Sequence, residues 1–214
     1  QKKISITRGL ASDVKSLMPQ DRYHPGAKSG VSPRWLPGTE AATYCAQGDE
    51  HDSEGNVDES ADNAVEQMEK RMRKMEALRE ALLEPEYGGL GVRDGGWDEE
   101  VDLLIVSWGS NKGVIQDALR DPVLHGKKIA YVHYTYLWPL KTDALKEALP
   151  KAKKTVLVEC NHEGQLGKRL HMEAGISFDH RLLKYDGRPF FYDELLGKIA
   201  DLVEAGDRVP IRLS

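Results

Sequence analysis

Short apolar runs alternate with helix-like segments through the second half of the chain. The expected strands lie near 101–107, 128–133, 154–159 and 178–184, and the expected helices near 111–120, 141–149, 163–174 and 192–204. The run from Leu103 to Val106 is apolar at every position, which is typical of a strand covered on both faces. Such alternation implies βαβ crossovers and a mostly parallel sheet. We therefore expect a three-layer α/β/α domain over residues 100–214.

A second pattern, with the period of an α-helix, predicts one long helix within residues 58–84. Its apolar residues recur at helical spacing and form one stripe: Val65, Met68, Met72, Met75 and Leu82. Ser60 is the expected N-cap, and Pro85 ends the helix. We expect this helix to dock on a neighbour through the stripe and to expose its charged face, which includes Lys70 and Arg71. A free coiled coil is disfavoured because Arg79 interrupts the seam.

The remaining segments are rich in turn-forming residues. Residues 1–57 carry many prolines and glycines with little periodicity, so we expect an irregular segment that packs against something outside it. Residues 85–99 are glycine-rich, which predicts a linker and a domain boundary. Because the sequence begins with Gln1 instead of methionine, we expect it to be part of a longer polypeptide.

Composition narrows the class of protein. The chain has 40% hydrophobic and 30% charged residues and a net charge of −5, with no basic stripe, so nucleic acid is not an expected partner. No apolar run approaches the roughly 18–20 residues that cross a bilayer, so no membrane span is expected. Cys45 and Cys160 lie far apart, so we expect no cysteine-ligated zinc or iron–sulfur site within this chain and a reducing, cytoplasmic location.

Loops that follow the strands are the first candidates for chemistry, because ligands bind beyond the carboxyl ends of parallel strands. Residues 107–113 offer a helix start to an anion but lack a nucleotide-binding glycine pattern, which favours a structural turn. The next loop gathers His133, Tyr134, Tyr136 and Trp138; this pattern favours an interface or core, and His133 has no visible partner for acid–base work.

Residues 159–165 place Cys160 and His162 close together with two carboxylates. A nucleophilic pair would need the imidazole to turn back onto the thiol, which neighbouring turn positions rarely achieve. A helix start with Asn161 as cap and Glu163 in the first turn accounts for the same residues. We therefore assign no catalytic residue and no metal ligand in this chain.

A further polar cluster spans residues 48–55, where acidic residues flank His51. Oxygen ligands at such spacing resemble a loose calcium loop, but the twelve-residue pattern of such loops is missing. A turn tied by carboxylate-to-backbone hydrogen bonds is the favoured interpretation.

Seven short strings, in order along the chain, resemble the α subunits of 2-oxoacid:ferredoxin oxidoreductases, with the 2-oxoglutarate branch as the closest fit. They lie at 30–38, 49–55, 68–75, 107–110, 136–139, 164–166 and 184–189, and they include Asp-Glu-His-Asp at 49–52 and Lys-Tyr-Asp-Gly-Arg-Pro at 184–189. The resemblance implies that residues 100–214 form a transketolase C-terminal-like domain. It also implies that residues 1–57, with the helix of 58–84, come from the end of a pyrimidine-binding domain.

The resemblance further implies an enzyme that oxidatively decarboxylates a 2-oxoacid with coenzyme A, giving an acyl-CoA, carbon dioxide and reduced ferredoxin. Such an enzyme uses thiamine diphosphate, Mg²⁺ and a [4Fe-4S] cluster. Its implied partners are a β subunit carrying cofactor and cluster, the remaining α-subunit domains and ferredoxin, in an (αβ)2 assembly. The chain by itself lacks the Gly-Asp-Gly motif with its downstream asparagine, so it is expected to serve mainly in assembly.

By the resemblance, two sets of residues are candidates for facing the active site or coenzyme A: Gly48, Asp49, Glu50, His51 and Asp52 in one, and Lys184, Asp186 and Arg188 in the other. Two alternatives stay open at this point. The chain could be a stand-alone flavodoxin-like module that binds a phosphorylated molecule at 109–113, or a purely structural assembly domain.

Overall fold

The computed structural model describes residues 18–35, 38 and 43–204, and the chain divides into two compact units. The N-terminal unit is Gln1–Ala81 and the C-terminal unit is Leu82–Ser214. Among the described residues, no helix is long and apolar enough to cross a membrane.

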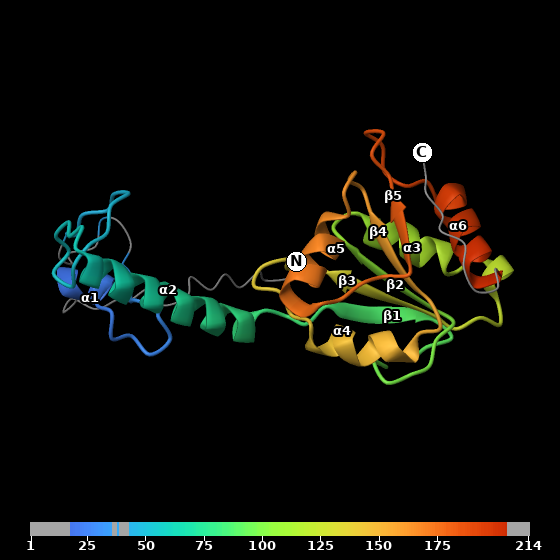
Figure 1. Cartoon of the computed structure of the whole chain (residues 1–214), viewed down its shortest axis with the longest axis horizontal. Helices are drawn as coiled ribbons and strands as arrows, with labels where there is room; N and C mark the ends of the chain where they lie inside the picture. Colours follow the sequence, from blue (N-terminus) through green and yellow to red (C-terminus); the bar gives the residue numbers. More distant parts are fainter. Residues whose placement is uncertain (1–17, 36–37, 39–42, 205–214) are drawn as a thin grey trace. The chain divides into compact units, whose positions relative to one another are not determined.

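A five-stranded sheet forms the centre of the C-terminal unit (Figure 1). Its strands are β1 (Glu86–Leu90), β2 (Leu103–Trp108), β3 (Ile129–Tyr134), β4 (Thr155–Glu159) and β5 (His180–Leu183), in the spatial order β1-β3-β2-β4-β5. Strands β2 to β5 pair in parallel, whereas β1 pairs antiparallel with β3 at one edge. The expected mostly parallel sheet is confirmed, and all four strands expected from the apolar runs are present.

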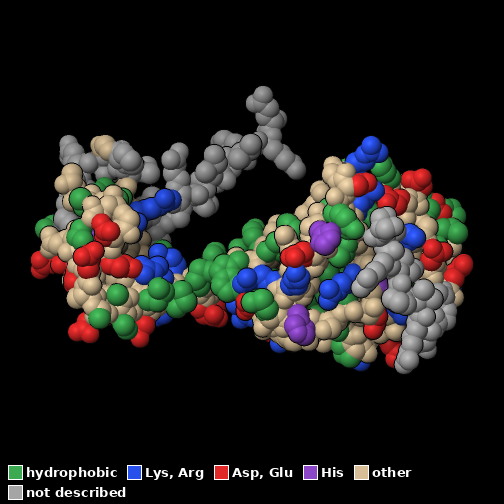
Figure 2. Space-filling view, turned by 45° about the horizontal axis from the view of Figure 1, so that its top comes forward, with side chains coloured by type: hydrophobic (Ala, Val, Ile, Leu, Met, Phe, Trp, Pro, Cys, Tyr) green, Lys and Arg blue, Asp and Glu red, His purple; other side chains and the backbone are tan. Residues whose placement is uncertain are grey.

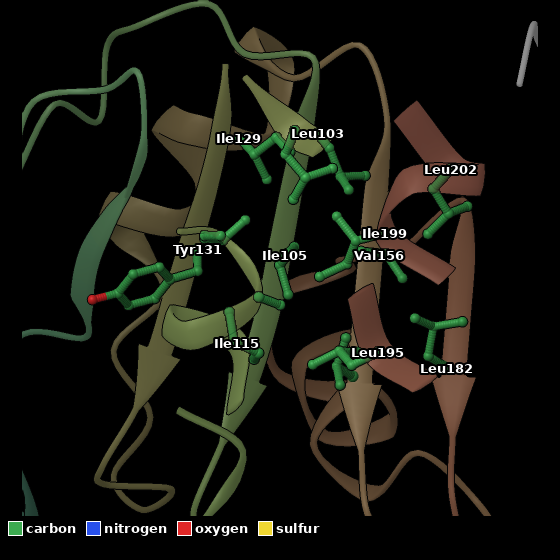
Figure 3. Close-up of a cluster of buried hydrophobic side chains, with 14 of the residues drawn as sticks. Leu103, Ile105, Ile115, Ile129, Tyr131, Val156, Leu182, Leu195, Ile199 and Leu202 are labelled. Atoms are coloured by element: carbon green, nitrogen blue, oxygen red, sulfur yellow. The ribbon is translucent and has the colours of Figure 1, made fainter. Parts of the chain in front are cut away.

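Helices cover both faces of this sheet, which confirms the expected three-layer α/β/α architecture. One face packs on α3 (Asn111–Ala118) and α6 (Tyr192–Glu204), and the other on α4 (Asp143–Ala148) and α5 (Gln165–Ala174). Short 3-10 turns at Pro122–Leu124 and Leu149–Lys151 complete the connections. Figure 3 shows the first core, where Ile115 and Leu195 from the helices meet Ile105 and Val156 from the strands.

Strand β1 corrects the first part of the linker predicted at 85–99, while residues 91–99 form turns without helix or strand. Glycines at 88 and 89 suggested a turn, but both lie in the strand, and Gly89 faces Ala130 of β3. A Cβ atom at Gly89, which has φ 158°, would lie 2.0 Å from the carbonyl oxygen of Ile129. Glycine is therefore required here for close approach of two backbones, a use that looks like a turn signal in sequence.

The N-terminal unit contains α1 (Pro19–Tyr23), the long helix α2 (Ala61–Ala81) and the loops between them. The Ser60 hydroxyl accepts a 3.3 Å hydrogen bond from the backbone N–H of Asn63, so the expected N-cap is confirmed. The described part of the expected irregular segment, from residue 18 to 57, contains one five-residue helix and no strand. Residues 1–17 of that segment lie outside the described residues.

The orientation of α2 is opposite to the prediction. Val65, Met68 and Met72 of the apolar stripe are half-exposed, at 57%, 50% and 55%. The buried positions of the helix are polar, namely Asn63, Gln67 and Lys70. Since Asn63 donates to the carbonyl of Asp58 and Gln67 to that of Tyr23, the polar face satisfies loop backbone groups that would otherwise be left unpaired.

Candidate functional site

Three loops meet beyond the carboxyl ends of β2, β4 and β5 in the C-terminal unit. The Cys160 Sγ lies 3.1 Å from the Asn111 Oδ1, and the rings of His162 and Tyr185 are 4.7 Å apart. Residues 107–113, 159–165 and 184–188 are thus brought together from distant parts of the sequence.

Glu159 organises this edge although it is fully buried. Its carboxylate accepts hydrogen bonds from the Trp108 indole at 2.9 Å, from the Asn161 amide at 2.7 Å and from the backbone N–H groups of Leu166 and Gly167 at 3.1 Å each. A buried carboxylate needs such donors to offset its lost hydration. Glu159 therefore anchors the start of α5 to the ends of β2 and β4.

The neighbouring Cys160 and His162 do not form a pair in this arrangement. Asn161 accepts backbone hydrogen bonds from residues 163, 164 and 165 at 3.2, 2.7 and 3.1 Å and so closes the turn before α5. The predicted helix start with Asn161 as cap and Glu163 in the first turn is wrong, because α5 begins at Gln165 and Gly164, with φ 68°, is its N-cap. His162 stacks edge-on against Tyr185 instead of facing the thiol. Although Cys160 is exposed, partial desolvation raises the pKa of its thiol, which disfavours the thiolate that nucleophilic chemistry requires.

The turn at 107–113 uses its polar groups internally. The Asn111 side chain is buried and donates to the carbonyl oxygens of Trp108 and Val158, at 3.5 and 3.4 Å. Ser110 makes no side-chain cap hydrogen bond. The strand, turn and helix of the predicted structural turn are all present here.

The aromatic loop after β3 is part core and part surface. Tyr134 is buried and donates to the carbonyl of Lys141 at 2.9 Å, whereas Trp138 is 55% exposed and carries the Arg169 guanidinium 4.1 Å above its ring. Burial lowers the pKa of His133, whose Nδ1 has no hydrogen-bond partner among the described residues. A cavity beside this loop holds only about 10 Å³, room for a single water molecule.

The candidate residues at 184–188 form an ion-paired turn. The Lys184 Nζ lies 2.9 Å from the Glu194 carboxylate and 3.2 Å from that of Asp186. Asp186 also accepts the backbone N–H of Arg188 at 3.0 Å, and this bond lowers the pKa of its carboxyl. Lys184 and Asp186 are thus used to shape the loop, while Arg188 is exposed at its tip.

Residues of the other candidate set, 48–52, line a cavity of about 330 Å³ within the N-terminal unit, with the exception of Asp52. Glu50 accepts two hydrogen bonds from the Arg71 guanidinium, one of them at 3.0 Å, and this pairing lowers the pKa of the Glu50 carboxyl. His51 is buried and stacks on Tyr23 with ring centroids 4.4 Å apart. Four of the five predicted residues, Gly48, Asp49, Glu50 and His51, reach the cavity wall.

Asp52 points into the turn behind the cavity. Its carboxylate accepts from the backbone N–H groups of Glu54 and Asn56, both at 2.9 Å, which confirms the predicted carboxylate-tied turn. The described residues contain no group of three His, Cys, Asp or Glu side chains placed to hold a metal ion.

The rest of the cavity wall was not predicted from sequence. Apart from Ala46 and Gln47, it comes from α1 and α2, as Arg22, Tyr23, Gln67, Lys70, Arg71 and Lys74. Residues 63, 67, 70 and 74 share one helical face, so the spacing was visible in the sequence. The burial of this face could not be predicted from the spacing, because a charged helical face normally faces solvent.

Comparison with known proteins points to one family. No protein-family model matches the chain. It is 33% identical over 210 residues to the α subunit of 2-oxoacid:ferredoxin oxidoreductase 1 from Aeropyrum pernix, covering 96% of this chain and 31% of that protein. It is 32% identical over 181 residues to the corresponding α subunit from Saccharolobus solfataricus, covering 85% of this chain and 28% of that one. The chain thus spans about 30% of the length of these curated relatives.

A solved structure shares the fold as well. A 2-oxoglutarate:ferredoxin oxidoreductase from Magnetococcus marinus, with 2-oxoglutarate, coenzyme A and succinyl-CoA bound, superposes with a TM-score of 0.76 at 25% identity. The match covers 91% of this chain and 32% of that chain.

Proposed function

We propose that this chain, which is homologous to the α subunits of 2-oxoacid:ferredoxin oxidoreductases, works as the C-terminal part of such a subunit. The enzyme would convert a 2-oxoacid, coenzyme A and oxidised ferredoxin into an acyl-CoA, carbon dioxide and reduced ferredoxin. We propose 2-oxoglutarate as the substrate, in line with the solved relative. The observation that carries this proposal is identity of 32–33% sustained over 85–96% of the chain.

We further propose that the redox cofactors lie on a β subunit. A [4Fe-4S] cluster does not fit this chain, because its two cysteines, Cys45 and Cys160, are free and stand alone. Thiamine diphosphate with Mg²⁺ does not fit residues 184–188 either, since Lys184 and Asp186 are tied to each other. When bound to its own subunit, thiamine diphosphate supplies the carbon nucleophile and electron sink that decarboxylation requires.

We propose that the exposed apolar surfaces of this chain bind other parts of the complex. The stripe of α2, with Met68 and Met72 half-exposed, and the exposed Trp138 of the C-terminal unit would each be covered in the complex. In Figure 2, hydrophobic side chains gather along the C-terminal half of α2. The proposed neighbours are the remaining α-subunit domains and the β subunit, in an (αβ)2 assembly that ferredoxin visits.

The domain assignments follow the same logic. We propose that residues 1–57 are the end of a pyrimidine-binding domain and that 58–84 are the long helix that ends it. Residues 100–214 are proposed to be a transketolase C-terminal-like domain. Within them, the cavity lined by residues 48–51 and the exposed Arg188 are the proposed contributions to ligand binding. A cytoplasmic location, expected from the cysteine usage, stays a prediction.

Reconstitution tests the proposed function directly. The chain, joined to the missing α-subunit domains and co-purified with the β subunit, should reduce ferredoxin in a reaction that requires both coenzyme A and 2-oxoglutarate. Reaction mixtures that lack coenzyme A, or contain the chain alone, provide the controls and should show no reduction. If the assembled complex fails to reduce ferredoxin whichever 2-oxoacid is supplied, the assignment is wrong.

A further inference from the structure

The cavity of the N-terminal unit is built around a lysine without a counter-charge. Lys70 is 5% exposed, and within the described part of the chain it makes no hydrogen bond and no ion pair. Burial, followed by repulsion from Lys74 and Arg22, lowers the pKa of Lys70 to about 8. The ammonium group is therefore still mainly charged at neutral pH, although its partial desolvation makes that charge less favourable than in water.

The nearby carboxylates do not compensate this charge. Glu50 is taken by a two-pronged ion pair with Arg71, and Asp49 accepts from the Gln47 amide at 3.0 Å. Arg22, Lys70, Arg71 and Lys74 bring four cations to the wall, against two carboxylates. The wall thus has an excess of positive charge, which a bound anion would neutralise.

Two further polar atoms beside the cavity lack partners. The Nε of Arg22 and the Nε2 of His51 are both buried without a hydrogen bond to any described residue. Buried polar atoms in folded proteins are nearly always paired with protein, water or ligand, so these two atoms have hydrogen-bonding capacity to offer a group bound in the cavity. His51 is 4% exposed and lines the cavity, so its ring is held in place for such a contact.

We propose that this cavity binds the oxyanion of a small metabolite, a phosphate or a carboxylate group, against Lys70 with Arg22 and His51 alongside. Its volume of about 330 Å³ is enough for a small molecule and is open enough for exchange with solvent. The inference rests on the proposed function only for the choice of ligands, since 2-oxoglutarate carries carboxylates and coenzyme A carries phosphates.

Anion binding can be measured on the 214-residue chain without catalysis. Isothermal titration with sodium phosphate, 2-oxoglutarate and coenzyme A, each against sodium chloride of matched ionic strength, should give saturable binding for at least one. A response to phosphate and coenzyme A identifies a phosphate site, whereas a response to 2-oxoglutarate alone identifies a carboxylate site.

Lys70→Met separates this role from a structural one. The variant should weaken binding roughly tenfold or more, because a charged hydrogen bond is lost, yet it should raise the midpoint of thermal unfolding by removing an uncompensated buried charge. Lys28→Met removes an exposed lysine of the same unit and should leave both quantities unchanged. Lys70→Arg keeps the charge and should retain measurable binding.

Absence of saturable binding with all three anions would overturn the proposal, as would equal binding by the wild type and Lys70→Met. Neither result bears on ferredoxin reduction by the assembled enzyme, so the two proposals can fail independently.

Discussion

At the scale of single residues, the most consequential side chains of this protein are buried charges with opposite fates. Glu159 is fully buried and has donors on both carboxylate oxygens. Lys70 is almost as deeply buried, and its ammonium group has no hydrogen-bond acceptor among the described residues. A buried charge with complete hydrogen bonding serves the fold, whereas one without it indicates a partner that is not yet in place.

Replacing Glu159 tests the first of these roles. Glu159→Gln keeps the shape but loses the charge and turns one acceptor into a donor that faces backbone N–H groups. We expect the free energy of unfolding of the C-terminal unit to fall by about 2–4 kcal/mol. Urea denaturation followed by circular dichroism measures this change.

The matched control is Glu163→Gln, on the same loop. Glu163 is exposed and pairs with Lys168 at the surface, so its loss should change the free energy of unfolding by less than about 1 kcal/mol. Equal effects of the two substitutions would contradict the anchoring role of Glu159.

Residue-scale prediction from sequence succeeded where neighbours in the chain are also neighbours in space. The segment 48–52 could be singled out because its polar residues are consecutive, and the cap by Ser60 because capping is local. The basic residues Arg22, Lys70 and Arg71 could not be predicted as part of the same site. They approach Glu50 and His51 only when α2 packs on the loops.

At the scale of elements, α2 shows the limit of periodicity. The spacing predicted the helix and its N-cap, both of which the structure confirms. It also predicted burial of the apolar stripe, which was wrong in this structure, because the loops of residues 18–57 need hydrogen-bond donors and cations more than apolar contacts. Periodicity identifies two faces of a helix but not which neighbour each face meets.

Substitutions on the two faces of α2 should reveal this reversal. The double variant Met68→Gln, Met72→Gln should alter the free energy of unfolding of the chain by less than about 0.5 kcal/mol, as for surface positions. Gln67→Ala, on the opposite face, should cost roughly 1 kcal/mol because the carbonyl of Tyr23 loses its donor.

The same double variant has a second readout in the assembled enzyme. If the stripe is an assembly surface, the double variant should associate more weakly with the rest of the complex. Sedimentation of the purified components measures this association. If the double variant lowered the free energy of unfolding of the isolated chain by several kcal/mol, that would contradict the exposed position of Met68 and Met72.

At the scale of the whole molecule, the chain consists of two units of different construction. The C-terminal unit contains both apolar cores, one on each face of the sheet. In the described part of the N-terminal unit, the contacts are polar ones from α2 and the stacking of Tyr23, Trp35 and Tyr44 with their neighbours. We therefore expect the C-terminal unit to be the more stable of the two.

A fragment of residues 82–214 tests this independence. It should fold by itself, with cooperative thermal unfolding and dispersed amide resonances, because its core needs no residue before 82. A fragment of residues 91–214 serves as the contrast, since it loses β1 and the hydrogen bond from Tyr131 to Glu86. It should unfold at a lower temperature; a disordered 82–214 fragment would show that the units do not fold independently.

The sequence by itself determined the α/β class, the four parallel strands, the helices between them and the Ser60 cap of α2, because these depend on periodicity and on groups a few residues apart. Only the tertiary structure decided that glycines 88 and 89 lie in an edge strand, that α2 turns its polar face inward, and that Lys70 shares a cavity with His51. Each of these depends on which backbone or side chain approaches from a distant segment, and that pairing leaves no periodic trace in the chain.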